Sequence, residues 1–285
     1  MKLFYEFCRV RFCVLTEQPM WEDADSPKFY IPPCEPDISI DVRPVPALPE
    51  PPGDLLGAFG EKKLWRSGNL ITRQTRDPFR RLPHMSASYT LADVHHVTCR
   101  VREEDWRWAT RSQFFWPGVA LPQLLSHFGA LVFHASYIEC GGSAILFTAP
   151  SQTGKSTQAA LWQKYCGASL VNGDKAGVRM LDGQFCACGM PFSGTSGVCE
   201  NRTRPLRAVV TLSQAPETSI RRLGPAEAIA RLSENVFADM RVAEEWQQTL
   251  SRLLDLAAAV PIYHLACTPD RSAVDALAQA LACEA

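Results

Sequence analysis

One stretch of the chain combines a strand, a loop and a lysine in an order that suits phosphate chemistry. An apolar run from Ala144 to Thr148 is typical of a buried strand, and a helical pattern runs from Gln158 to Tyr165. The loop between them ends in Gly-Lys-Ser-Thr at residues 154–157. A strand, a loop ending in Gly-Lys-Ser and a helix together predict a site for a nucleoside triphosphate.

Each residue type in this loop has a task in binding phosphates. Backbone N–H groups at a helix N-terminus attract anions, and Gly154 lets the backbone approach them closely. Lys155 can reach the terminal phosphates, and the Ser156 hydroxyl can hold Mg²⁺. We therefore predict ATP and Mg²⁺ as ligands, with GTP fitting the same motif. The predicted nucleotide-binding residues are Ala149, Pro150, Ser151, Gln152, Thr153, Gly154, Lys155, Ser156 and Thr157.

The motif departs from its usual form at one position. Ala149 stands where a leading glycine is usual, and Pro150 follows it. The competing interpretation is a structural turn that spells the motif by chance. Because the flanking strand and helix are also in place, the sequence favours a phosphate-binding loop.

A carboxylate follows the next buried strand along the chain. Asp174 ends the segment that begins at Leu170, 19 residues after Lys155. Because the carboxyl ends of parallel strands meet in one crevice, Asp174 is expected to point toward the phosphates near Lys155. A carboxylate there can hold Mg²⁺ or take a proton from an acceptor hydroxyl. The alternative is an ordinary turn aspartate, which the preceding Gly173 would favour.

A histidine lies on the strand before the loop. His134 belongs to the apolar segment 131–139, and the Gly141-Gly142 pair predicts a hairpin from this segment to the strand that ends at Thr148. A single histidine on an apolar strand is more often a core residue than a functional one. By itself, His134 is therefore a weak candidate.

The order of elements predicts an α/β protein with a mixed sheet. We expect a β-rich accessory region over residues 1–115 and a P-loop domain over residues 116–285. Strands are predicted at residues 4–15, 38–45, 70–75, 131–139, 143–148, 168–171, 177–180, 184–188, 206–212 and 262–266. Helices are predicted at residues 117–129, 158–165, 225–240 and 242–259, and after the N-cap Asp270.

The composition is that of an ordinary globular protein and excludes several classes of partner. The chain has 285 residues, of which 46% are hydrophobic and 21% charged, and its formal net charge is −1. This balance gives no sign of a nucleic-acid surface. No apolar stretch reaches the roughly 20 residues that a membrane span needs, and the N-terminus has a strand pattern rather than that of a signal peptide. A cytoplasmic protein without membrane contact is expected, and homo-oligomerisation stays open.

The cysteines favour free thiols over a disulfide framework or a metal site. There are eleven, scattered along the chain, and no two of them form a C-x-x-C pair. An odd, dispersed set is typical of a reducing compartment. His95, His96 and Cys99 come nearest to a metal cluster, but no second ligand pair accompanies them.

Together, the loop, Asp174 and His134 resemble the HPr kinase family, within the broader phosphoenolpyruvate-carboxykinase-like P-loop group. The similarity covers about residues 130–215 and is fainter toward the end of the chain. The resemblance implies a mixed-sheet kinase-like domain in which the catalytic residues are Asp174, His134 and Lys155. It implies Ser156 and Asp174 as Mg²⁺ ligands.

The sequence departs from that family at two acidic positions. Gly173 replaces the first aspartate of the family's Asp-Asp pair, and Pro191 falls near the family's Mg²⁺-binding glutamate. Glu200 is a candidate substitute for that glutamate. One arginine is expected to face the phosphates, from the cluster Arg202, Arg204 and Arg207.

The resemblance implies a kinase that transfers the γ-phosphoryl group of ATP to a hydroxyl, preferably a serine, of a peptide, protein or small molecule. HPr is not the expected substrate, because the N-terminal third does not resemble the regulatory half of HPr kinases. A non-catalytic, nucleotide-binding pseudokinase acting as scaffold or sensor is the alternative, since two expected acids are absent. A transporter or motor ATPase would need an acidic pair after an apolar strand, and a carboxykinase would need a longer chain.

Overall fold

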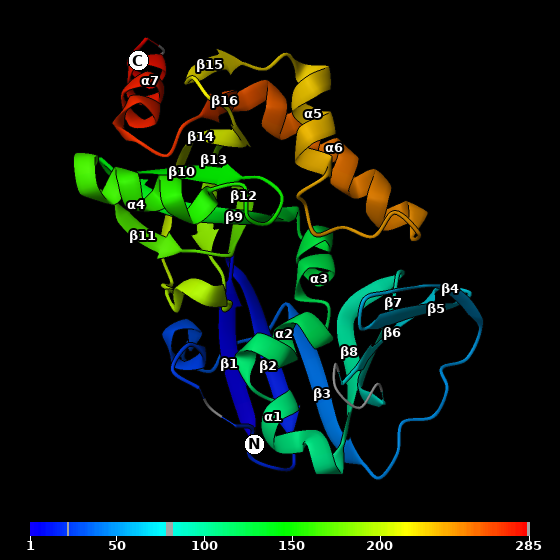
Figure 1. The fold of residues 1–285 in the computed structure, drawn as a ribbon. Coiled ribbons are helices and arrows are strands. Elements are labelled where there is room, and N and C mark those ends of the chain that lie inside the picture. Colours follow the sequence, from blue (N-terminus) through cyan, green and yellow to red (C-terminus); the bar gives the residue numbers. More distant parts are fainter. Residues whose placement is uncertain (22, 78–81, 284–285) are drawn as a thin grey trace. The chain divides into compact units, whose positions relative to one another are not determined.

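The computed structural model describes residues 1–21, 23–77 and 82–283 and shows a mixed α/β protein (Figure 1). The chain divides into two compact units, Met1–Phe128 and Gly129–Ala285, and each unit has its own mixed sheet. The division falls after Phe128, whereas the sequence placed a boundary between residues 115 and 116. Among the described residues, no helix combines the length and apolar character that crossing a membrane requires.

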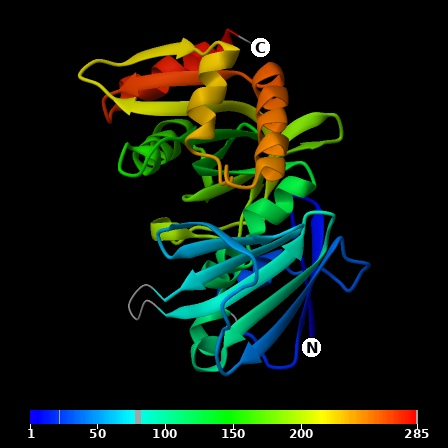
Figure 2. The same ribbon diagram turned by 90° about the vertical axis from the view of Figure 1, so that its right-hand side faces the viewer.

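The first unit is built on an eight-stranded sheet, whose strands are coloured blue to cyan in Figure 2. In pairing order the strands are β1 (Lys2–Phe7), β2 (Val10–Thr16), β3 (Ile38–Val45), β8 (Asp93–Arg102), β7 (Pro83–Thr90), β6 (Leu70–Arg76), β5 (Lys62–Ser67) and β4 (Asp54–Phe59). Strands β2, β3 and β8 are parallel to one another, and the other neighbours are antiparallel. This unit also holds α1 (Trp106–Ala109), α2 (Ser112–Gly118) and α3 (Leu121–His127).

An aromatic cluster packs α2 against the first strands of this sheet. The ring of Trp116 lies edge-on to Tyr5, Phe7 and Phe12, with ring centroids 4.9, 4.7 and 5.9 Å apart. Edge-to-face contacts at these distances are favourable for aromatic rings, and burial of such large rings supplies most of the driving force for packing. The N-terminal unit thus has a core of its own.

Two elements that were predicted as continuous in this unit are each divided in two by residues with a left-handed backbone. The run 4–15 is two strands, because Cys8 and Arg9 have φ of 52° and 57° and form a tight hairpin turn. The helix predicted over residues 117–129 is divided between α2 and α3, because Ala120 is left-handed (φ 61°) and interrupts the helical path.

The second unit is a sheet with helices on both faces. Its strands are β9 (Ala130–Cys140), β10 (Ser143–Thr148), β11 (Ser169–Asn172), β12 (Lys175–Leu181), β13 (Gln184–Gly189), β14 (Thr203–Gln214), β15 (Ser219–Arg222) and β16 (Ile262–Cys267). Helices α4 (Lys155–Cys166) and α7 (Arg271–Ala282) cover one face, and α5 (Pro225–Ser233) and α6 (Ala243–Ala259) cover the other (Figure 1). In Figure 2, α5 and α6 run side by side.

Strand β14 shows why both faces are covered. From Ala208 onward its side chains alternate between the two layers: Ala208, Val210 and Leu212 join the core under α4 and α7, whereas Val209 joins the core under α5 and α6. Leu206 also joins the second core, because the register shifts between Leu206 and Ala208. A strand that is buried on both faces reads as a continuous apolar run, which is the pattern that predicted it.

The directions of the strands bring several carboxyl ends to one edge. Strands β10, β14 and β16 are parallel, and β11 and β10 both run antiparallel to β9. The carboxyl ends of β11, β10, β14 and β16 therefore lie along the same edge, in the order set by their pairing. In open α/β sheets this edge is where ligands bind.

The remaining predictions in this unit are mostly confirmed. The strands at 131–139, 143–148, 184–188 and 262–266 and the helix at 242–259 are present within one or two residues, and Asp270 caps α7 by accepting from the backbone N–H of Ser272 at 2.8 Å. The predicted helix 225–240 ends at Ser233, because the next residues pair with β9: His134 N–H donates to Asn235 O at 2.8 Å. Strand β15 was not predicted.

Candidate functional site

The Gly-Lys-Ser loop connects β10 to α4 at the carboxyl edge of the sheet. Gly154 precedes the helix with φ of 115°, a conformation that L side chains rarely adopt, so glycine is needed there. Among the residues that the structure describes, no side chain caps this end of the twelve-residue helix α4. Its first N–H groups are therefore available to an anion, and the helix dipole favours negative charge at that end.

The side chain of Lys155 packs against the loop that precedes α4. Its side chain is buried, and its ammonium group donates to the carbonyl oxygens of Ala149 and Pro150 at 2.8 and 3.1 Å. An ammonium group has three N–H donors, so these contacts leave one for another acceptor. Burial lowers the pKa of Lys155, and the negative charge of Asp174 opposes that shift.

Asn172, the last residue of β11, holds the turn that carries Asp174. Its side chain is fully buried, and its Oδ1 accepts from the backbone N–H groups of Asp174 and Lys175 at 2.8 and 2.9 Å. Its Nδ2 donates to the carbonyl oxygens of Met190 and Phe192, both at 2.9 Å. All of its hydrogen-bonding capacity is used, and it ties the turn to the segment after β13. No role was predicted for Asn172 from the sequence.

Asp174 is the centre of a charged cluster with His134 and Lys175. His134 Nδ1 lies 3.4 Å from Asp174 Oδ1 and 3.2 Å from the Asp174 carbonyl oxygen, and the Lys175 ammonium group pairs with Asp174 Oδ2. The pairing of β9 with β12 sets His134 opposite Lys175. The structure therefore brings His134, which was the weakest candidate from the sequence, into contact with Asp174.

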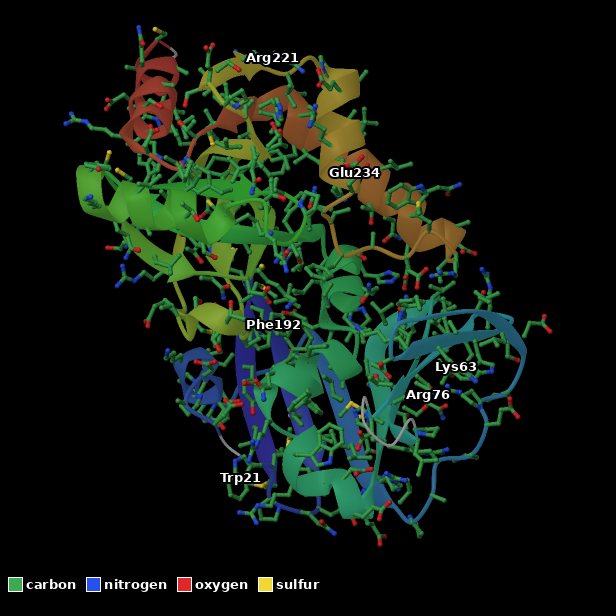
Figure 3. The ribbon with its side chains drawn as sticks, in the orientation of Figure 1. Trp21, Lys63, Arg76, Phe192, Arg221 and Glu234 are labelled. Atoms are coloured by element: carbon green, nitrogen blue, oxygen red, sulfur yellow. The ribbon has the colours of Figure 1, made fainter. Side chains whose placement is uncertain are left out.

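Lys175 was missed by the sequence analysis, although it is a central part of this cluster. Its ammonium group lies 4.7 Å from the ring centroid of Phe192 and 5.3 Å from that of Phe237. Phe192, labelled in Figure 3, comes from the segment after β13. Contacts with aromatic faces stabilise a partly desolvated cation. Only the fold could reveal this, because Phe192 and Phe237 are distant from Lys175 in sequence.

The cluster keeps Asp174 ionised. Burial of the carboxyl group would raise its pKa, but the hydrogen bond from His134 and the charge of Lys175 outweigh burial, and the pKa of Asp174 is lowered to about 2. At neutral pH the group is a carboxylate that accepts hydrogen bonds.

This low pKa predicts a pH-dependent contribution of Asp174 to stability. Because the folded pKa lies below the unfolded value of about 3.9, the stabilisation is present above about pH 4 and is lost as the pH falls through about 2. We expect Asp174→Asn to lower the free energy of unfolding by roughly 2 kcal/mol at pH 7 and by about half as much at pH 3. Urea unfolding of both proteins at the two pH values measures this, and an equal difference at both would contradict it.

Gly173 lies where the resembled family has an acid, and its surroundings leave no room for one. A Cβ atom at Gly173 would lie 2.3 Å from Ser196 Oγ and 2.6 Å from Ser196 Cβ. Ser196 belongs to the short 3₁₀ turn Gly194–Ser196, and a Cβ at Gly194 would lie 2.5 Å from Asp174 Cβ. The segment after β13 thus packs closely against the Gly173–Asp174 turn. Ser196 occupies the space that a side chain at residue 173 would need.

We expect Gly173→Ala to destabilise the protein by about 1–3 kcal/mol, the usual cost of overpacking. The exposed Ser196 should tolerate Ser196→Gly alone with little effect, and the double variant should recover most of the stability lost in Gly173→Ala. Thermal unfolding of the three variants and the parent measures this. If the double variant is as unstable as Gly173→Ala, Ser196 is not the cause.

The arginine cluster lies elsewhere. Glu139 Oε1 accepts from Arg204 Nε at 2.7 Å, Glu139 Oε2 accepts from Arg202 Nη1 at 3.2 Å, and Arg207 donates to the carbonyl oxygen of Leu281 in α7 at 3.1 Å. Glu139 is paired with the amino end of β10, opposite to the end that carries the loop. The expectation that one of these arginines faces the phosphates is therefore wrong.

The oxygen donors of the site suit Mg²⁺. This ion keeps several waters and is commonly held by one or two protein oxygens together with substrate phosphates. The Ser156 hydroxyl and the Asp174 carboxylate are donors of this kind. Over the described residues, no three His, Cys, Asp or Glu side chains gather as a metal site, and His95, His96 and Cys99 form none. All eleven cysteines lie within the described residues, and none of them forms a disulfide there.

The fold defines a mixed α/β protein with a Gly-Lys-Ser loop at the carboxyl edge of its second sheet. A family model described as "SynChlorMet cassette protein ScmC" matches residues 119–275. Because this match spans more than half of the chain, the protein belongs to that family. No curated protein matches the sequence.

Among solved structures, the HPr(Ser) kinase/phosphatase from Coxiella burnetii is similar over 54% of this chain and 88% of its own. The identity is 13% and the TM-score 0.32. At this level the similarity carries no residue roles from that enzyme to this chain.

Proposed function

We propose that this protein is an ATP-dependent kinase that transfers the γ-phosphoryl group to a hydroxyl, preferably a serine, of a peptide, protein or small molecule. The observation that carries the proposal is the convergence of two groups at one sheet edge. The loop with Lys155 follows β10, and Asp174 follows β11, whose carboxyl end lies on the same edge. An anion site beside an ionised carboxylate is what phosphoryl transfer to a hydroxyl requires.

The residues divide the work of transfer as follows. The backbone N–H groups of the loop and the Lys155 ammonium group offset the charge of the phosphates, and Ser156 and Asp174 would hold Mg²⁺. When bound, Mg²⁺ would supply further neutralisation of the phosphate charge. Asp174 accepts the hydrogen bond of the acceptor hydroxyl and then its proton. The bond from the γ-phosphorus to ADP breaks as the bond to the hydroxyl oxygen forms.

His134 and Lys175 act on Asp174 rather than on the phosphates. His134 donates to the carboxylate and fixes its orientation, while Lys175 keeps it ionised. Because the pKa of Asp174 is about 2, the carboxylate is a weak base that takes the proton late in the transfer. A loose transition state places little demand on the base and most demand on positioning and charge.

The test is ADP release by the purified protein with ATP, Mg²⁺ and serine-containing peptides, proteins and small molecules as acceptors. Release that depends on the acceptor, with a phosphoserine detected by mass spectrometry, supports the proposal. Nucleotide binding without acceptor-dependent release contradicts it.

A pseudokinase is the second candidate, and one observation favours it. The space at Gly173 is filled by Ser196, and Pro191 has no side chain that can bind a metal. Two acids of the resembled family are thus replaced, one of them by close packing. This candidate predicts tight ATP binding and no phosphorylated product with any acceptor.

A further inference from the structure

A cavity opens beside the Gly-Lys-Ser loop, on the side away from Asp174. Its volume is about 570 Å³, within the range of small-molecule sites. It is lined by the loop residues Gln152, Thr153 and Gly154, by the first turns of α4, and by the segments that follow β14 and β16. The cavity is therefore continuous with the loop and lies at the same carboxyl edge of the sheet.

The order of strands separates the cavity from the charged cluster. Strand β10 carries the loop and lies between β14 and β9. The ends of β14 and β16, which border the cavity, lie on one side of β10, and the Asp174 turn after β11 lies on the other. A molecule that crosses the loop would have one end at Asp174 and the other in the cavity.

The walls of the cavity combine flat apolar groups with polar ones. Ala215, Pro216 and Pro269 contribute apolar surface, and Gln158, Gln214 and Thr268 contribute hydrogen-bonding groups. Walls that combine apolar surfaces with hydrogen-bonding groups suit a planar heteroaromatic ring, whose faces need packing and whose edge needs partners.

Gln158 supplies an independent indication of a ligand. Its side chain is 2% exposed, and its Nε2 donates to Cys267 Sγ at 3.2 Å, which fixes the orientation of the amide. Its Oε1 is buried and has no hydrogen-bond partner within the described structure. A buried amide oxygen without a hydrogen-bond partner lowers the stability of the folded state. An N–H or O–H donor from a ligand in the cavity would supply the hydrogen bond that is missing.

We infer that this cavity binds the nucleoside part of the nucleotide, and that Gln158 Oε1 accepts a hydrogen bond from it. The inference rests on the proposed function, because it takes the triphosphate to be bound by the loop. With the terminal phosphate toward Asp174, the chain of phosphates crosses the end of β10 and delivers the base and ribose to the cavity.

The test compares ATP with inorganic triphosphate, which has the phosphates but no nucleoside. Isothermal titration calorimetry with the full chain measures both dissociation constants in the wild type and in Ala215→Trp, which fills the cavity. We expect ATP to bind at least about 10-fold more weakly to Ala215→Trp, with triphosphate binding unchanged within about 2-fold.

A second variant removes only the amide. Gln158→Met keeps the length of the side chain and should weaken ATP about 10-fold without affecting triphosphate, the size of one lost hydrogen bond to a buried group. Gln163→Met is the matched control, because Gln163 is exposed on the same helix and does not line the cavity. It should bind both ligands as the wild type does.

The outcomes separate this inference from the proposed function. Equal binding of ATP by the wild type, Ala215→Trp and Gln158→Met, with triphosphate also bound, would overturn the nucleoside site and leave the phosphate loop standing. A loss of both ligands in Ala215→Trp with unchanged binding in Gln158→Met would also overturn it, since the effect would then come from the loop. If the wild type binds neither ligand, the proposed function fails and the inference fails with it.

Discussion

Lys155→Ala should lower phosphoryl transfer about 100- to 1,000-fold, the usual effect of removing one donor that stabilises charge in a transition state. The substitution removes the ammonium group that faces the loop and releases the carbonyl oxygens of Ala149 and Pro150. The nucleotide should also bind more weakly, because the charge of its phosphates loses its nearest cation. Acceptor-dependent ADP release and calorimetric titration with ATP measure the two effects.

Lys164→Ala is the matched control for this prediction. Lys164 lies on the same helix, at the end far from the loop, and its side chain is exposed. It should transfer phosphate at the wild-type rate. Undiminished activity in Lys155→Ala would show that phosphoryl transfer does not depend on this loop.

Asp174→Asn should leave nucleotide binding within about 3-fold of the wild type and lower transfer by about 100- to 10,000-fold, the range for loss of an acid–base group. Asparagine has the same shape but cannot accept the proton of the acceptor hydroxyl. It also loses its pairing with Lys175, so the folded state must be verified by circular dichroism before kinetics are compared.

The matched control is Asp255→Asn on the exposed surface of α6. It removes one carboxylate from the chain without touching the cluster and should have no effect on transfer. If Asp174→Asn instead loses Mg²⁺-dependent nucleotide binding and keeps its rate at saturating ligand, Asp174 serves the metal alone and does not accept the proton.

The elements that form the second sheet were largely predictable, because local signals define them. These local signals include the apolar runs of β10 and β14, the Gly141-Gly142 turn and the N-cap Asp270. Each of them depends only on residues that are close together in the sequence. The early end of α5 was not predictable, since it depends on the pairing of residues 235–237 with β9, more than ninety positions earlier in the chain. Backbone hydrogen bonds to a distant strand outweigh helix propensity there.

By itself, the sequence determined the chemistry of the loop. Gly154, Lys155 and Ser156 are neighbours in the chain, so their spacing fixes their geometry once a strand precedes them and a helix follows. It also determined that Asp174 follows a buried strand, and hence on which edge of a parallel arrangement it would lie.

Only the tertiary structure decided which groups act together. Four contacts join residues from different elements. They are His134 with Asp174, Lys175 with the rings of Phe192 and Phe237, Asn172 with the turn that carries Asp174, and Ser196 with Gly173. The cavity under Gln158 also joins residues from different elements, because it is closed by segments after β14 and β16. The physical reason is that charge interactions and packing act over a few ångströms in space, whatever the separation in sequence, and only the folded chain sets those distances.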